Sequence, residues 1–302
     1  MERVDVLVAL ILFYAAFSYA DQAANPPPAS SGPNCGLVDV PQRPNPKRLS
    51  DTRIIGGLEA RPHSHPWIVS VRKRGDHLCG GSLIRSGSDE GSNIVVTAAH
   101  CIGERGPEVF SVLAGAHNLD PNKYAKNQVL VNVTRIRVHE NYNSKTLEND
   151  IAVLRLADLV PFGPHIQPVC LAKSDAKLVD GVEVTAAGWG HMVEGAFAHA
   201  QELMQVGLPV VSSEKCNAAL ATPNDRNPIV PSAMLCAGGE GGKDACQFDS
   251  GGPLIFRHGL HYGLHGIVSF GNGCGRSGMP GVYTRVSTFL PWIKDSMQRL
   301  TG

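Results

Sequence analysis

Short apolar runs, broken repeatedly by Gly, Pro, Asn or Asp, set the strongest limit on how this 302-residue chain folds. Such runs predict β-strands, and many short strands separated by turn residues are typical of barrels and sandwiches. Examples of these predicted strands are residues 67–71, 93–97, 109–113, 130–138, 151–156, 182–186 and 267–270. Apolar residues recur at helical spacing from Phe289 to Leu300, where Pro291 suits a first turn. We therefore expect an all-β protein whose only clear helix is at the C-terminus.

The leading residues have a different character from the rest of the chain. Residues 6–17 are apolar and are followed by Ser18-Tyr19-Ala20, a small-x-small cleavage pattern, so residues 1–20 are predicted to be a signal peptide. Residues 1–5 are not net positive on their side chains, which departs from the usual pattern. The apolar run is shorter than the roughly 20 residues of a membrane span, and no later run reaches that length.

Residues 21–53 contain seven prolines and are predicted to be an extended pro-segment that buries little apolar surface. Residues 54–302 are then the folded domain. The chain is expected to be secreted and extracellular, without a membrane span.

Cysteine usage agrees with secretion. An even count in a secreted chain suggests four disulfides, although eight cysteines allow about 105 pairings. A zinc site would need closely spaced C-x-x-C pairs, and the sequence has none. The eight are Cys35, Cys79, Cys101, Cys170, Cys216, Cys236, Cys246 and Cys274.

The charge balance gives no reason to expect a polyanionic partner. Lys plus Arg and Asp plus Glu are equal at 27 each. A nucleic acid or an anionic membrane would favour an excess of basic residues. We therefore expect no nucleic-acid partner.

Three segments together carry the residues for nucleophilic catalysis. His100 ends an apolar strand, Asp150 opens another, and Ser250 precedes two glycines. A serine hydroxyl is a weak nucleophile that needs an adjacent base. Histidine serves as that base when a buried carboxylate fixes its tautomer. Each residue alone is commonly structural; the order His, Asp, Ser along the chain is the specific signal.

The motifs Thr97-Ala98-Ala99-His100-Cys101 and Asp249-Ser250-Gly251-Gly252-Pro253 resemble those of the chymotrypsin family of serine endopeptidases, in its trypsin-like branch. The resemblance runs from Ile54 to the C-terminal helix. It implies two packed antiparallel Greek-key β-barrels with a C-terminal helix and the active site between the barrels. It also implies that His100 is the general base, Asp150 orients it, and Ser250 is the nucleophile.

A nucleophile elbow, the other common serine arrangement, is excluded. It requires glycine two residues before the serine, where this chain has Phe248. It also requires the acid to lie between serine and histidine in chain order.

The same resemblance selects one set of disulfides. Cys79 with Cys101 would clamp the histidine strand, and Cys246 with Cys274 would join two walls of the substrate pocket. Cys216 with Cys236 would staple a surface loop. Cys35 with Cys170 would keep the pro-segment attached after cleavage. Each would add about 2 to 4 kcal/mol by restricting the unfolded chain.

Activation by cleavage is a further implication. A cut after Arg53 frees an ammonium at Ile54, and the resemblance supplies Asp249 as its buried partner. That ion pair would order the pocket and the oxyanion hole beside Ser250. Before cleavage Asp249 needs another partner, and Ser70 and His77 stand where some zymogens of the family hold it.

Specificity is expected from Asp244, six residues before Ser250. In trypsin-like members the matching aspartate lies at the pocket floor and pairs with a basic side chain. Gly271 and Gly281 match the small residues that leave the pocket open. Ala245 has no hydroxyl to help solvate a lysine, so arginine should be preferred for its planar, bidentate fork.

One residue departs from the family pattern. Phe248 stands where glycine is usual, and its backbone N–H and that of Ser250 should form the oxyanion hole. A bulky residue at positive φ is strained by roughly 1 to 3 kcal/mol. We expect a slower or more selective protease. The alternative is a catalytically impaired binding protein on the same fold, whereas an inhibitor or matrix protein has no sequence feature in its favour.

The remaining predictions concern metals, modification and partners. The loop 116–128 has one carboxylate, Asp120, whereas calcium takes six to eight oxygens, so no calcium is expected there. His261 and His265 lack metal-binding geometry, and we expect neither a metal nor a cofactor. Asn132-Val133-Thr134 is a glycosylation sequon. Expected partners are protein substrates and protein protease inhibitors, with the enzyme a monomer.

Overall fold

The computed structural model describes residues 34–44, 57–120, 122–123, 126, 128–191, 195, 199–221 and 229–302. The predicted signal peptide, most of the pro-segment and the Arg53–Ile54 bond lie outside these residues.

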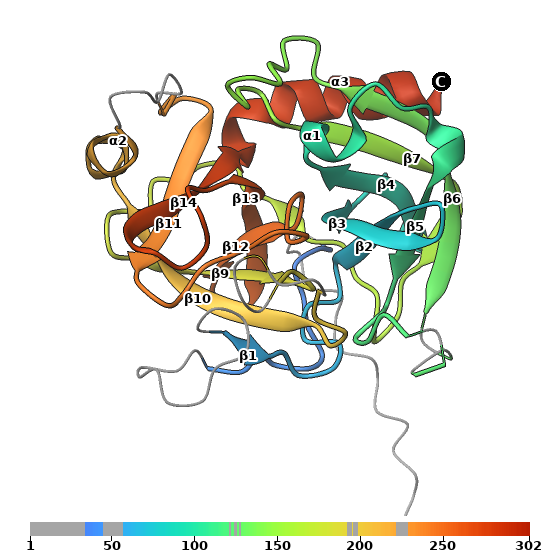
Figure 1. The fold of residues 1–302 in the computed structure, drawn as a ribbon. Helices are drawn as coiled ribbons and strands as arrows, with labels where there is room; N and C mark the ends of the chain where they lie inside the picture. Colours follow the sequence, from blue (N-terminus) through green and yellow to red (C-terminus); the bar gives the residue numbers. More distant parts are fainter. Residues whose placement is uncertain are drawn as a thin grey trace, which may run out of the picture. The chain divides into compact units, whose positions relative to one another are not determined.

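Six antiparallel strands close the first barrel in the order β2-β3-β4-β7-β6-β5 (Figure 1). Its inward side chains are aliphatic; Val69, Val95 and Leu154 each expose 1% or less. The strands are β2 Ile68–Lys73, β3 Asp76–Ile84, β4 Gly91–Thr97, β5 Phe110–Ala114, β6 Val129–Val138 and β7 Ala152–Pro161.

Six further strands make the second barrel, in which β9 pairs with both β12 and β10 and so closes the sheet. They are β9 Glu183–Gly188, β10 Met204–Val211, β11 Met234–Glu240, β12 Pro253–His258, β13 His261–Phe270 and β14 Ser277–Arg285. Two short strands flank it: β1 Leu58–Glu59 pairs with β10, and β8 Cys170–Leu171 runs parallel to β13. The all-β, two-barrel architecture expected from the sequence is confirmed.

The expected C-terminal helix is α3, Leu290–Thr301, which packs across β6 and β7 (Figure 1). Arg135 and Arg155 of these strands donate to the Leu300 carbonyl at 3.2 and 2.6 Å, which satisfies an acceptor at the helix end. Among the described residues no helix is both long and apolar enough to cross a bilayer.

Two other α-helices, α1 Ala99–Ile102 and α2 Ser213–Leu220, escaped the sequence analysis. Short 3₁₀ turns occupy Pro107–Val109 and Val286–Phe289. The expectation that helix is confined to the C-terminus was therefore wrong. In α2 only Cys216 and Leu220 are buried. Two buried residues are too few to produce a recognisable helical periodicity of apolar residues in the sequence. The available signal was Ser212, an N-cap that accepts from the Lys215 backbone.

Residues 34–44 lie against the two-barrel domain and are held by more than the Cys35–Cys170 disulfide. The Gly36 N–H donates to the Pro168 carbonyl and the Tyr262 N–H donates to the Gly36 carbonyl, both at 2.8 Å. Gly36 has φ of 68°, and a Cβ there would lie 2.2 Å from the Tyr262 oxygen. Only glycine permits so close an approach.

Candidate active site

The first barrel contributes a histidine–aspartate pair. His100 lies in the single turn of α1, directly after β4, and Asp150 lies two residues before β7. His100 Nδ1–H donates to Asp150 Oδ2 at 2.7 Å, and the His100 backbone N–H donates to Oδ1 at 2.9 Å. The contact fixes the neutral ring as the Nδ1–H tautomer, which leaves Nε2 as a proton acceptor.

The second barrel completes the surroundings of this aspartate. Ser269 of β13 donates to Asp150 Oδ2 at 2.6 Å, and Thr284 of β14 donates to the Asp150 carbonyl at 2.7 Å. Asp150 is fully buried, so the Ser269 hydroxyl, with the two His100 N–H groups, replaces the water that an ionised carboxylate would otherwise need. The Thr284 hydroxyl satisfies the Asp150 backbone carbonyl. Ser269 and Thr284 were missed from the sequence, because neither belongs to a motif and both lie far along the chain.

Ser250 lies in the loop between β11 and β12 and ties the two barrels together. Its carbonyl accepts from the N–H of Gly80 in β3 at 2.8 Å. The next residue, Gly251, has φ of 78°, and a Cβ there would lie 2.2 Å from Thr97 Oγ1. The serine loop thus presses on the end of the strand that leads into His100, which brings the two motifs together.

Phe248 has φ of 71°, so a bulky side chain occupies the left-handed region at this loop position. Its ring lies beside His191 and His199, with centroids 4.9 and 5.8 Å away. The predicted backbone strain depended on a positive φ, and Phe248 has one. Packing of the Phe248 ring against the two histidines offsets part of the free energy of that strain.

His77 has a different partner from the one expected. Ser70 Oγ–H donates to its Nδ1 at 2.8 Å, and its Nε2–H donates to the Phe248 carbonyl at 3.2 Å, rather than to Asp249. Burial, reinforced by His199, lowers the His77 pKa to about 4, so the ring is neutral. The Ser70–His77 pair thus supports the carbonyl next to Asp249.

Asp249 instead accepts from the backbone N–H groups of Gly190 at 2.7 Å and Cys246 at 2.9 Å. It is 3% exposed, and burial raises its pKa to about 6. A Cβ on Gly188 or Gly190 would lie 2.1 or 2.3 Å from its carboxylate oxygens, so both glycines are needed to admit it.

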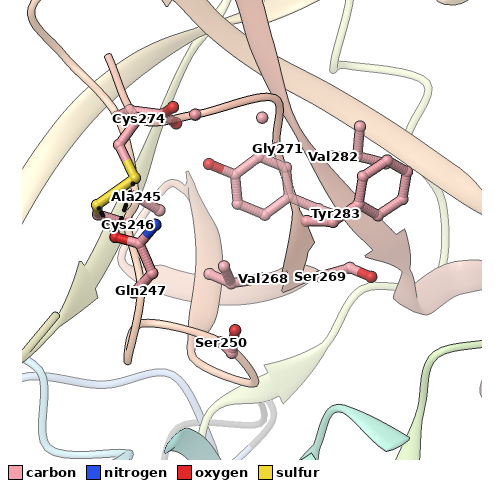
Figure 2. Close-up of a pocket in the computed structure, with 14 residues that line it drawn as sticks. Ala245, Cys246, Gln247, Ser250, Val268, Ser269, Gly271, Cys274, Val282 and Tyr283 are labelled. Carbon is pink, nitrogen blue, oxygen red and sulfur yellow. Dashed lines mark hydrogen bonds between the residues drawn. A yellow bond between two sulfur atoms is a disulfide. The ribbon is translucent and has the colours of Figure 1, made fainter. Parts of the chain in front are cut away.

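Asp244 lies in a pocket of about 170 Å³ (Figure 2). The disulfide between Cys246 and Cys274 forms one side and the Tyr283 ring another, with Ser250 also lining the pocket. Gly271 and Gly281 line it as expected. A Cβ on Gly281 would lie 3.1 Å from Asp244 Oδ1, so larger residues would crowd the carboxylate.

The Asp244 carboxylate is only half satisfied. Oδ2 accepts from the Gly275 N–H at 3.0 Å, whereas buried Oδ1 has no hydrogen-bond partner within the described part of the chain. The group is 3% exposed, and burial raises its pKa to about 7. A bound cation would restore its ionised form.

The disulfides of the structure join the pairs that the resemblance implied: Cys35–Cys170, Cys79–Cys101, Cys216–Cys236 and Cys246–Cys274. Among the described residues, one group has metal-like spacing, namely Cys79, His100 and Cys101. Its two sulfurs form a disulfide and are not thiolate ligands. Asn132 lies on β6 with its side chain exposed.

The two barrels, the His100–Asp150 pair and the serine loop together define a serine hydrolase of the two-barrel class. The family model described as trypsin matches residues 54–293. The chain is 40% identical over 259 residues to coagulation factor XII of Rattus norvegicus, covering 82% of this chain and 41% of that protein. It is 37% identical over 257 residues to the vitellin-degrading protease of Bombyx mori, covering 84% and 89%.

A third relative, the clotting factor G beta subunit of Tachypleus tridentatus, is 39% identical over 257 residues, covering 81% of this chain and 79% of that protein. The chain spans less than half the length of the coagulation factor XII relatives. It belongs to the trypsin family of serine proteases.

Proposed function

We propose that this protein is a secreted endopeptidase that cleaves after Arg or Lys and is made as a zymogen activated by cleavage after Arg53. Residues 1–20 would be the signal peptide, 21–53 the pro-segment and 54–302 the protease domain. One observation carries the specificity: the unpartnered, buried Oδ1 of Asp244 in a pocket open to substrate.

A basic side chain is the group that satisfies this pocket. An unpaired ionised carboxylate is costly in a buried site, and a guanidinium or ammonium would pay that cost by charge pairing and hydrogen bonds. The missing hydroxyl at Ala245 favours arginine, whose fork engages two carboxylate oxygens at once. Gly271 and Gly281 leave room for its long side chain.

The proposed chemistry is acyl transfer through Ser250. His100 Nε2 takes the hydroxyl proton as Ser250 Oγ attacks the scissile carbonyl, and Asp150 stabilises the resulting imidazolium. The N–H groups of Phe248 and Ser250 would bind the developing oxyanion. His100 then gives the proton to the departing amine, which breaks the peptide bond. Water attacks the acyl ester with the same base and frees Ser250.

In the proposed activation, the Ile54 ammonium supplies the cation that Asp249 lacks. The Asp249 carboxylate accepts two backbone N–H groups and has no charged partner among its described bonds. Burial raises its pKa to about 6 despite these two hydrogen bonds. An ammonium brought to it would lower the pKa and stabilise the loop that carries Phe248 and Ser250.

The second candidate is a catalytically impaired binding protein, favoured by the positive φ of Phe248. The two candidate functions share the same fold, and they differ in whether the protein turns over a peptide substrate. We prefer the enzyme because a binding protein would need neither the Asp244 pocket nor the His100–Asp150 pair. Protein substrates and protein inhibitors are its proposed partners, with a monomeric enzyme and a glycan on exposed Asn132.

The deciding experiment activates the purified chain and assays peptide esters of Arg, Lys and Phe in parallel, beside Ser250→Ala. We expect the order Arg, Lys, Phe in kcat/KM. The Ser250→Ala variant should lose about 10⁶ in kcat, as loss of a triad nucleophile does, with unchanged thermal unfolding. Residual turnover within about tenfold of the parent would refute the assignment of Ser250.

A further inference from the structure

A second cavity, separate from the proposed active site, lies beside the Cys35–Cys170 disulfide. Its volume is about 720 Å³, and it shares no lining residue with the Asp244 pocket. Its size falls within the roughly 300 to 1,000 Å³ of small-molecule sites. Nothing in the proposed proteolysis uses it.

The body of this cavity is apolar. The disulfide, Leu171, Ala172 and Tyr262 line it, and Tyr262 is itself 9% exposed. β8 runs beside β13 through two paired residues, so the wall is built on regular backbone. A preformed apolar wall favours a ligand with an apolar chain or ring.

The charged groups at this cavity are basic. Among its described lining residues are Arg85 and Lys173, together with two histidines, and none is acidic. Arg85 is already engaged, since it pairs with Asp89 and donates to the Asn34 carbonyl. Lys173 is exposed and has no ion-pair partner within the residues that the structure describes. Lys173 is therefore the cation available to a ligand.

The two histidines are held in fixed positions. His258 Nε2 meets Nε2 of buried His265 at 2.8 Å with one proton between them, and His265 Nδ1–H donates to Asp175 at 2.7 Å. His261 Nδ1–H donates to the Cys35 carbonyl at 2.9 Å. Burial lowers the pKa of His258, so its ring adds polarity rather than charge at neutral pH.

We propose that this cavity binds a small amphipathic carboxylate, with its apolar body against Leu171 and Tyr262 and its anionic head at Lys173. Charge complementarity on an apolar wall favours this ligand, because a cationic amphiphile would meet Lys173 with like charge and a neutral one would leave Lys173 without a partner.

The probe for the test is decanoate, measured by calorimetric titration into the full chain, with decyltrimethylammonium as a matched cation. One decanoate should bind per chain, and the cation should bind at least tenfold more weakly. The Lys173→Glu variant should weaken decanoate by about tenfold or more, because one charge-assisted contact is replaced by repulsion. Lys294→Glu, the same change at an exposed lysine of α3, should leave binding within about twofold.

Two controls locate the site. Thermal unfolding shows that the variants are folded, which keeps the test independent of any protease activity. A diazirine-bearing decanoate should label peptides that contain residues 169–174 or 258–263. Labels elsewhere, no binding at millimolar decanoate, equal binding of the cation, or full affinity in Lys173→Glu would each overturn the proposal. Binding of an acidic peptide but not of decanoate would also overturn it.

Discussion

Two buried aspartates, five residues apart in the β11–β12 connection, have similar burial and different surroundings. Asp244 and Asp249 are both 3% exposed, and burial raises both pKa values, to about 7 and about 6. Asp249 is enclosed by Gly188 and Gly190 and accepts two backbone N–H groups. Asp244 opens on the pocket and keeps one oxygen unpartnered.

The comparison teaches that burial alone does not assign a role to a carboxylate. Two further properties decide the role: how many of the carboxylate oxygens lack a hydrogen-bond donor, and the route by which a cation can reach them. In the proposed enzyme, Asp244 pairs with the basic side chain of the substrate, whereas Asp249 pairs with the Ile54 ammonium that cleavage of the chain produces. The following changes separate these two roles.

The largest effect is expected at Asp249 and its proposed partner. Arg53→Gln should leave an uncut zymogen with activity reduced by about 10³ or more, because an unformed oxyanion hole alone costs about 10² to 10³. Asp249→Asn should be cut normally and still show a similar loss, since an amide cannot balance the ammonium. Ester hydrolysis and N-terminal sequencing of the active form, expected to begin at Ile54, check both.

The control for cleavage is Arg61→Gln, at an exposed arginine that follows the proposed site; it should activate normally. Full activity from an intact single chain would exclude the proposed role of Asp249.

A smaller effect is expected at Asp244, and it should fall on selectivity. Asp244→Ser should lower kcat/KM for an Arg ester by roughly 10² to 10³, since a buried charge partner is worth about 2 to 5 kcal/mol. Turnover of a Phe ester should hold or rise. Asp158→Ser, at an exposed acid of β7, should change neither. Retained Arg-over-Phe preference in Asp244→Ser would mean that the cation binds elsewhere.

The raised pKa of Asp244 predicts a pH dependence of cation binding. A cation binds the ionised carboxylate, so below pH about 7 the inhibition constant of benzamidine should rise about tenfold per pH unit. The same raised pKa means that Asp244 costs the empty domain stability as pH rises from about 4 to about 7, because the unfolded carboxylate ionises first.

Competitive inhibition measured from pH 5 to 9 on the cleaved enzyme checks this dependence. In that form the Ile54 ammonium should lower the pKa of Asp249 and remove it from the window. Asp244→Asn should bind benzamidine weakly and independently of pH. A flat profile for the parent would contradict the raised pKa.

The smallest effect is expected at Phe248, which neighbours Asp249 without sharing its charge. Phe248→Gly should relieve about 1 to 3 kcal/mol of backbone strain and free the approach to the oxyanion donors. We expect up to about tenfold higher turnover of a protein substrate and tighter binding of a bulky protein inhibitor. Preference for Arg over Lys should hold, because Asp244 is untouched.

Phe248→Ala separates the causes, since it removes the ring and keeps the strained φ. Equal gains in both variants would assign the effect to the ring, and a gain confined to glycine would assign it to the backbone. Unchanged turnover and inhibition in both would show that packing against His191 and His199 already compensates for the phenylalanine.

The sequence predicted the all-β architecture correctly because short apolar runs separated by turn residues leave local signals. A histidine or serine beside a cysteine and small residues is a local signal too, and it marks the segments that we propose are catalytic. What escaped prediction depends on distant contacts. Ser269 and Thr284 reach Asp150 only after both barrels have closed.

The bonding of His77 was also beyond the sequence. The sequence places His77 beside the serine loop. It does not show whether the His77 ring bonds to the Asp249 carboxylate or to the carbonyl of the preceding residue, Phe248, because these acceptors are one residue apart and the loop conformation decides between them. The two raised aspartate pKa values likewise depend on the amount of protein that covers each carboxylate. No local pattern of residues encodes that coverage.

The covalent hold on residues 34–44 has a consequence for how the protease meets other molecules. The Cys35–Cys170 bond and the hydrogen bonds around Gly36 fix this segment to the domain whether or not the chain is cut after Arg53. A molecule captured by residues just before Cys35 would therefore be confined near the catalytic domain. Its next encounter with that domain would be intramolecular, at an effective concentration on the order of millimolar for a short linker. Weak binding of a protein to the residues just before Cys35 would then be enough to favour its encounter with the protease domain over that of unbound proteins.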